Sequence, residues 1–164
     1  MIDSYFLKTV SKFNLDVSRE TLERLDEYSK DIILKNKEIN LISKSTEDSI
    51  KSRHIADSMQ TIDFIDKNDI KICTDLGSGA GLPGIVLGII MSSKKPTFKV
   101  IFYEKSYHKS NFLREMSKKF HLDAEIYQKN IFNEKNLITD VIISRAFKPL
   151  PVIFQIAKTN FKNF

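Results

Sequence analysis

One stretch decides the fold of this 164-residue chain: Asp75-Leu76-Gly77-Ser78-Gly79-Ala80-Gly81-Leu82-Pro83-Gly84. It follows the apolar segment 70–75 (IKICTD) and precedes the apolar segment 84–91, so we expect it to join a strand to a helix. Glycine allows positive φ and lets a ligand approach the backbone, and a helix N-terminus offers free N–H groups. The stretch therefore predicts a loop that binds a nucleotide-like cofactor.

Two glycine spacings overlap in this loop. Gly79, Gly81 and Gly84 fit G-x-G-x-x-G, the spacing of dinucleotide sites. Gly77, Gly79 and Gly81 instead fit G-x-G-x-G behind the acidic Asp75, a pattern typical of S-adenosylmethionine sites. Dinucleotide enzymes usually need a substantial catalytic domain beyond the first βαβ units, and little chain remains for one. We therefore favour S-adenosyl-L-methionine, with an NAD-binding Rossmann domain as an alternative.

Strand and helix patterns alternate after the loop. Strands are predicted at 99–104, 124–127 and 140–144, with a helix at 107–120 and a last helix that Pro149 and Pro151 open. This alternation predicts an α/β fold with a parallel, Rossmann-like sheet in the order 3-2-1-4. Glu104 ends the second strand, where a carboxylate can accept hydrogen bonds from both ribose hydroxyls of a nucleoside.

The front of the chain, residues 1–69, reads as helical. Ser18 is a candidate N-cap, and Ser45 with Asp48 has the form of a capping box that opens a helix. Apolar residues recur at helical spacing in two stripes: Phe6, Val10 and Phe13, then Leu22, Leu25, Tyr28, Ile32 and Ile33. We expect this segment to pack on the sheet domain.

Charge and composition narrow the class of protein. The composition, 41% hydrophobic and 29% charged, argues against disorder. Residues 1–70 carry a net charge of −3 and residues 71–164 carry +8, which indicates either a polyanionic partner or merely lysine-rich usage. No apolar run approaches the ~20 residues of a membrane span, and no signal peptide is evident. The single cysteine, Cys73, excludes a disulfide framework, so we expect a cytoplasmic protein.

Five segments in order resemble one family, the bacterial 16S ribosomal RNA guanine-N7 methyltransferases (RsmG/GidB). The segments are 40–43 (NLIS), 53–58 (RHIADS), 75–85 (DLGSGAGLPGI), 109–114 (KSNFLR) and 144–147 (SRAF). The pairing of RHIADS with GSGAGLPG is the specific part of the match. The resemblance implies a class I methyltransferase sheet that binds S-adenosylmethionine over 70–164, and 16S ribosomal RNA or the small ribosomal subunit as the substrate of a monomeric enzyme.

The loop spacing and the resemblance together give a set of site residues. Arg145 at the end of the fourth strand is the predicted catalytic residue, orienting the guanine or a phosphate, or else forming a salt bridge there. Asn40, Arg53 and His54 are candidate substrate contacts, with a turn and an anchoring role as alternatives. His54 has no second ligand at metal spacing, so we expect no metal. The predicted cofactor contacts are Asp75, Gly77, Gly79, Gly81, Leu82, Glu104, Asn130, Ile131, Phe132 and Arg145.

Two departures from the family pattern stand out. Asn130 occupies a position where the family usually has arginine, and asparagine is neutral and shorter. The chain also ends at Phe164, where the family continues to closing strands, so the domain is expected to be C-terminally incomplete. An inactive or incomplete remnant of the family is therefore a further alternative.

Overall fold

The computed structural model describes residues 10–11, 17–67 and 69–164. Val10 is buried, whereas the expected core contributions of Phe6 and Phe13 lie outside the described residues. The first long helix, α2 (Arg19–Asn36), begins after Ser18, whose side chain accepts a hydrogen bond from the backbone N–H of Thr21. The predicted N-cap is therefore confirmed.

The sheet consists of four parallel strands: β1 (Ile72–Leu76), β2 (Lys99–Tyr103), β3 (Ala124–Tyr127) and β4 (Val141–Ser144). Their order is β3-β2-β1-β4, which confirms the predicted Rossmann-like order. β2 and β3 follow on one side of β1, whereas β4 lies on the other side, so the order of strands switches between β1 and β4. Ligands of such sheets bind at the carboxyl ends of the strands, near this switch point.

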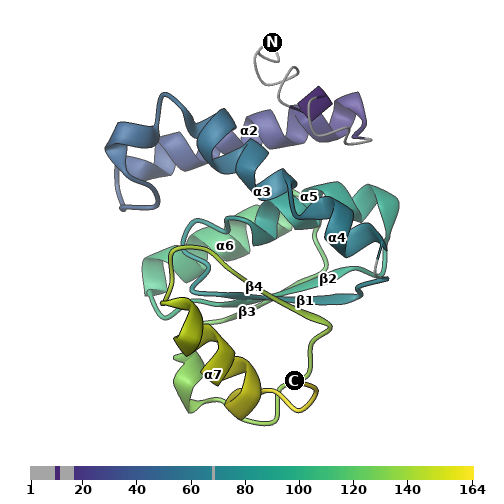
Figure 1. Cartoon of the computed structure of the whole chain (residues 1–164). Coiled ribbons are helices and arrows are strands. Elements are labelled where there is room, and N and C mark those ends of the chain that lie inside the picture. The colour runs from purple at the N-terminus through teal and green to yellow at the C-terminus, as the bar shows by residue number, and fades with distance from the viewer. Residues whose placement is uncertain (1–9, 12–16, 68) are drawn as a thin grey trace.

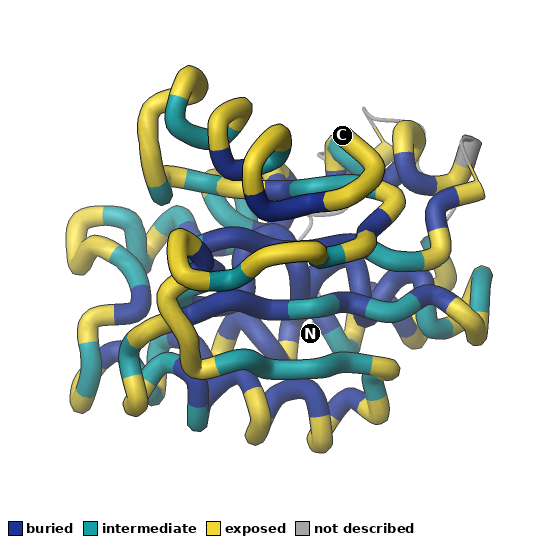
Figure 2. The backbone as a smooth tube through the Cα atoms, turned by 90° about the horizontal axis from the view of Figure 1, so that it is seen from below, coloured by how far each residue is buried: buried dark blue, intermediate teal, exposed yellow. Residues whose placement is uncertain are grey.

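Helices cover both faces of the sheet (Figure 1). On one face lie α5 (Gly84–Lys94) and α6 (Tyr107–Lys119), and on the other lies α7 (Leu150–Asn160), with Pro149 as its N-cap. Figure 2 shows that α7 leaves part of its face of the sheet in view. Buried residues fill α5 from Gly84 to Met91, because this helix is covered on both sides.

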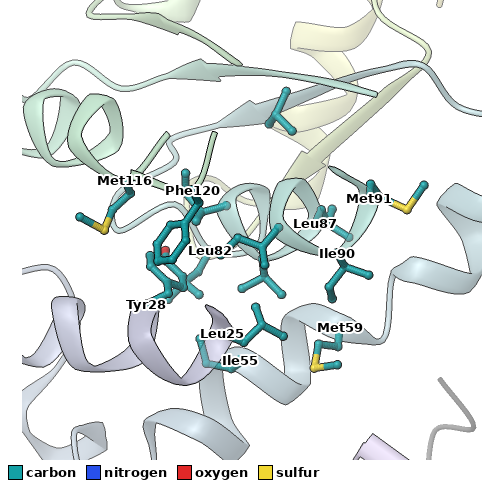
Figure 3. Close-up of a cluster of buried hydrophobic side chains, with 14 of the residues drawn as sticks. Leu25, Tyr28, Ile55, Met59, Leu82, Leu87, Ile90, Met91, Met116 and Phe120 are labelled. Atoms are coloured by element: carbon teal, nitrogen blue, oxygen red, sulfur yellow. The ribbon is translucent and has the colours of Figure 1, made fainter. Parts of the chain in front are cut away.

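A further layer of helices lies on α5 and consists of α2, η1 (Lys44–Thr46), η2 (Lys51–Ala56), α3 (Asp57–Met59) and α4 (Ile62–Lys67). Apolar side chains from this layer and from α5 and α6 form one core (Figure 3). Leu25 and Tyr28 of α2 and Ile55 of η2 contribute fully buried side chains to that core. This packing fixes the helical layer relative to the loop that follows β1.

The prediction of a capping box at Ser45 is wrong. Ser45 lies inside the short 3-10 helix η1, and its hydroxyl pairs with that of Ser43 at 2.9 Å instead of capping a helix. The next helix, η2, is a π-helix that starts only at Lys51. Within the described residues, no helix is both long and apolar enough to cross a bilayer.

Candidate functional site

Two adjacent pockets open at the carboxyl ends of the strands. The larger, of about 310 Å³, we call the loop pocket, and the smaller, of about 170 Å³, the Glu104 pocket. Gly77 and Ala146 line both pockets, so the two form one divided cleft. The loop pocket is lined by Leu41, Ile42, His54, Gly77, Ser78, Gly79, Ala80, Leu82, Lys109, Arg145 and Ala146. The Glu104 pocket is lined by Gly77, Tyr103, Glu104, Lys105, Lys129, Asn130, Ile131, Ala146 and Phe147.

The glycine loop forms the floor of this cleft. Gly77 and Gly79 have φ angles of +69° and +55°, a left-handed region that side chains disfavour. A Cβ atom on Gly79 would meet nothing nearer than 3.8 Å, so its Cα faces open space in which a ligand can approach. A Cβ on Gly77 would lie 2.1 Å from Cδ2 of Phe147, whose ring therefore covers this glycine between the two pockets.

Gly81 and Gly84, in contrast to Gly79, lie closely packed against neighbouring side chains. A Cβ on Gly81 would lie 2.4 Å from Ile85, and one on Gly84 would lie 2.4 Å from the ring of Phe102. Both glycines allow close packing beneath the loop, and neither lines the two pockets. The position of Gly81 thus favours a packing role over the predicted cofactor contact. It also weakens the dinucleotide interpretation, which relied on Gly81 and Gly84.

Asp75 supports the loop from below. It is fully buried, and its Oδ2 accepts a hydrogen bond of 3.0 Å from the backbone N–H of Gly84 at the start of α5. Burial raises the pKa of Asp75 to about 7, with a smaller contribution from the nearby charge of Glu104. The hydroxyl of Tyr28 on α2 donates to the carbonyl of Ala80 in the same loop. These contacts assign Asp75 and Tyr28 to holding the loop in shape.

Glu104 follows β2 and reaches the edge of the loop, as its strand-end position predicts. Its Oε2 accepts a hydrogen bond of 2.8 Å from the N–H of Gly79, and its Oε1 accepts one of 2.8 Å from the N–H of Ser106. Each carboxylate oxygen has two acceptor positions, so one remains on each oxygen for a ligand hydroxyl. Glu104 thus holds the loop and borders the smaller pocket at once.

The predicted cofactor contacts at residues 130–132 divide between pocket and surface. Asn130 and the buried Ile131 line the Glu104 pocket, whereas Phe132 is 42% exposed and outside its lining. The side chain of Asn130 accepts a hydrogen bond of 3.3 Å from the N–H of Phe132, which caps the short helix η3 (Ile131–Asn133). Asn130 therefore stabilises the backbone that borders the pocket.

Arg145 links the end of β4 to the helical layer. Its guanidinium contacts Nδ1 of His54 at 2.8 Å, the carbonyl of Arg53 at 2.8 Å and Oδ2 of Asp57 at 3.4 Å. The other ring nitrogen of His54 lies 2.9 Å from the hydroxyl of Thr46. These contacts anchor the helical layer to the end of β4, which is one of the predicted alternatives for Arg53 and His54. His54 and Arg145 also line the loop pocket, whereas Arg53 lines neither pocket, and a contact of these residues with the substrate stays a prediction.

Asn40 itself is exposed and does not line either pocket, although its neighbours Leu41 and Ile42 line the loop pocket. Asn36, a buried residue that was not among the predicted site residues, shapes this connector. The Oδ1 atom of Asn36 accepts hydrogen bonds from the N–H groups of Leu41 at 2.7 Å and Ile42 at 3.0 Å. The signal that could have indicated Asn36 is a polar residue in line with the apolar stripe at the end of an amphipathic helix, because a buried polar side chain needs hydrogen-bond partners.

The chemistry of the cleft lining fits S-adenosylmethionine. The backbone at Gly79 is accessible to a ligand, and Leu82 forms an apolar part of the loop pocket. Glu104 keeps free acceptor positions beside the Glu104 pocket. Of the residues that line the two pockets, Glu104 is the only acid, whereas the basic ones are Lys105, Lys109, Lys129 and Arg145. No group of three potential metal ligands occurs among the described residues.

Comparisons with known proteins agree with this geometry. A family model described as rRNA small subunit methyltransferase G matches residues 21–163. A protein of Pelagibacter ubique named ribosomal RNA small subunit methyltransferase G is 44% identical over 153 residues, which cover 92% of this chain and 71% of the relative. A protein of the same name from Cereibacter sphaeroides is 36% identical, over 87% of this chain and 69% of the relative.

A solved structure shares the fold at low sequence identity. The crystal structure of coclaurine N-methyltransferase bound to N-methylheliamine and SAH superposes with a TM-score of 0.55 at 12% identity. The match covers 98% of this chain and 54% of that one. The two chains therefore share the Rossmann-like fold.

Proposed function

Because the chain belongs to the rRNA small subunit methyltransferase G family, we propose that it transfers a methyl group from S-adenosylmethionine to N7 of a guanine in 16S ribosomal RNA. The observation that carries the proposal is the divided cleft over the glycine loop, with Glu104 at one end and Arg145 at the other. We assign residues 70–164 to cofactor binding and residues 17–67 to a helical layer that completes one wall of the cleft.

The chain's own residues would hold the cofactor in two parts. Glu104 would accept hydrogen bonds from the ribose hydroxyls of the cofactor in the Glu104 pocket, and Ile131 would contact the cofactor's base there. Gly79 would let the cofactor approach the loop backbone in the loop pocket, which Gly77 also lines. S-adenosylmethionine supplies a methyl group made electrophilic by its positive sulfur.

N7 of guanine explains why the cleft needs little acid–base machinery. This nitrogen is a lone-pair acceptor on the major-groove edge, so it needs no general base. The contribution left to the protein is to place the base and to provide a favourable field. Arg145 at the end of β4 lines the larger pocket and is the residue we assign to orienting the guanine or its phosphate.

The basic lining supports an RNA substrate. Lys105, Lys109 and Lys129 surround the cleft with positive charge that phosphates would neutralise, so binding should weaken as salt increases. A guanine must leave a stacked helix to enter a pocket of this size, which favours a loop or an incompletely assembled subunit as the substrate.

Equilibrium binding tests the cofactor half of the proposal. Titration calorimetry with S-adenosylhomocysteine, the demethylated product, should give saturable one-site binding, and NAD should give none. Binding of NAD in place of S-adenosylhomocysteine would favour the dinucleotide alternative.

Arg145→Ala should abolish most methyl transfer while RNA binding persists, and full transfer by this variant would exclude the role assigned to Arg145.

A further inference from the structure

The hydrogen bonds around His54 can run in only one direction. The guanidinium of Arg145 has donors and no acceptor, so Nδ1 of His54, at 2.8 Å, must be the acceptor. At the other side of the ring, the hydroxyl of Thr46 already donates its proton to the carbonyl of Ser43 at 2.8 Å. Thr46 therefore accepts at 2.9 Å from Nε2 of His54, which must carry the proton.

This direction fixes both the charge and the tautomer of His54. The ring is neutral, with its proton on Nε2 and its lone pair on Nδ1 facing Arg145. Burial, the largest cause, and the charge of Arg145 lower the pKa of His54, which Arg53 also lowers and Asp57 raises. Lys109 of α6 is a further charged residue that lines the same pocket.

The backbone of η2 aims the ring at Arg145. His54 lies in a π-helix, the wider helix type that often occurs at functional sites. The same helix presents the carbonyl of Arg53 to Arg145, and Asp57 follows one turn later. Arg145 thus meets three acceptors from one short segment. Of these, only Nδ1 of His54 has a single lone pair and stops being an acceptor when it gains a proton.

We propose that His54 is a positioning residue, which holds the Arg145 guanidinium at the mouth of the cleft through its unprotonated Nδ1 and releases it when that nitrogen takes up a proton. The inference deepens the proposed function, since it rests on Arg145 acting in methyl transfer. It assigns no direct contact with the base to His54, because both ring nitrogens are occupied.

Nitrogen-15 NMR of the imidazole rings tests the tether without any substrate. In the full chain at pH 7, the His54 ring should show an unprotonated Nδ1 and a protonated Nε2, with a pKa below 6.5. Arg145→Leu should raise that pKa, and Thr46→Val should weaken the tautomer preference. The ring of His108, exposed on α6, serves as the internal reference. A proton on Nδ1 at pH 7, or a pKa that Arg145→Leu leaves unchanged, would overturn the proposal.

Two variants of His54 test its consequence for catalysis. Leucine removes the acceptor, so His54→Leu should lower kcat at least about tenfold while KM for S-adenosylmethionine changes little. Glutamine keeps an acceptor that cannot be protonated, so His54→Gln should recover most of the lost kcat and lack the decline of the wild type at acid pH. Unchanged kcat in His54→Leu, or an acid decline retained in His54→Gln, would contradict the positioning role.

The two experiments separate this inference from the proposed function. If the NMR results are as expected but the wild-type protein transfers no methyl group, the tether is present and the proposed function is wrong. If methyl transfer occurs and the NMR results differ, the proposed function holds and the inference about His54 fails. Circular dichroism of each variant at the assay temperature shows that it is folded.

Discussion

The Oε2 atom of Glu104 accepts a hydrogen bond from the backbone N–H of Gly79 at 2.8 Å. This contact joins the end of β2 to the glycine loop, 25 residues earlier in the chain. The same carboxylate accepts from the N–H of Ser106 at the start of α6. One side chain therefore sets the spacing between the loop, the second strand and the next helix, and the cofactor cleft depends on that spacing.

Replacing Glu104 with glutamine should disrupt this junction. Glutamine has one acceptor oxygen, so its NH₂ group would face either Gly79 or Ser106, each of which also donates. We expect a loss of about 1–3 kcal/mol in the free energy of unfolding, and at least about tenfold weaker binding of S-adenosylhomocysteine. Urea unfolding measures the change in unfolding free energy, and titration calorimetry measures the change in affinity. Glu23→Gln, at an exposed ion pair on α2, is the matched control and should change neither.

Asp75 should make the protein less stable as the pH rises. In the unfolded chain its carboxyl ionises near 3.8, whereas in the folded protein it stays protonated until about 7. The folded state therefore binds the extra proton between these values, and the free energy of unfolding falls with pH by at most on the order of 4 kcal/mol.

Asparagine at this position removes the titration and keeps an acceptor for the N–H of Gly84. The difference in unfolding free energy between Asp75→Asn and the wild type should therefore shift in favour of the variant from pH 4 to pH 7 and stay constant above it. Urea unfolding at several pH values measures this difference. An identical pH dependence in both proteins would contradict the raised pKa of Asp75.

Tyr28→Phe should loosen the glycine loop. The carbonyl of Ala80 would lose the hydroxyl that donates to it in a buried environment, at a cost of about 1–2 kcal/mol. Binding of S-adenosylhomocysteine should weaken because the loop is less ordered before the ligand arrives. Thermal unfolding and calorimetry give the two effects. Tyr107→Phe removes an exposed hydroxyl on α6 and should leave both values at those of the wild type.

Alanine at Gly77 should be poorly tolerated for two reasons. The φ angle of +69° costs a side chain about 1–2 kcal/mol, and the new Cβ would collide with the ring of Phe147. Phe147→Ala removes only the second cause. We expect the double variant to be more stable than the sum of the single effects predicts, by about 0.5–3 kcal/mol. Additive effects would show that the ring does not limit this position.

The sequence predicted the sheet well, because each strand is a short apolar run and each begins or ends at a recognisable turn. The positions of the glycine loop and of Glu104 at strand ends were also predicted, since they follow from the topology. The roles of Asp75 and Gly81 were harder to predict. Spacing cannot distinguish a glycine that faces a ligand from one that packs against Ile85 beneath the loop.

Long-range contacts explain what the sequence could not reveal. Arg145 and His54 are 91 residues apart, and His54 lies in a π-helix that no periodic pattern indicated. Ser45 had the form of a helix cap, but its hydroxyl bonded to Ser43 instead. Asn36 shapes the connector through backbone hydrogen bonds that have no signature in spacing. Local patterns thus located the cleft, and tertiary contacts decided which side chains border it.

A methyl-transfer assay on small ribosomal subunits and on their isolated RNA tests whether the protein methylates N7 of a guanine. Subunits from a strain without an endogenous enzyme of this family are incubated with the protein and isotopically labelled S-adenosylmethionine, then digested to nucleosides and analysed by mass spectrometry. We expect label in 7-methylguanosine at one position of 16S ribosomal RNA, and none with heat-denatured protein. A folded protein that binds S-adenosylhomocysteine but transfers no methyl group, or that labels another nucleoside, would contradict the proposed function.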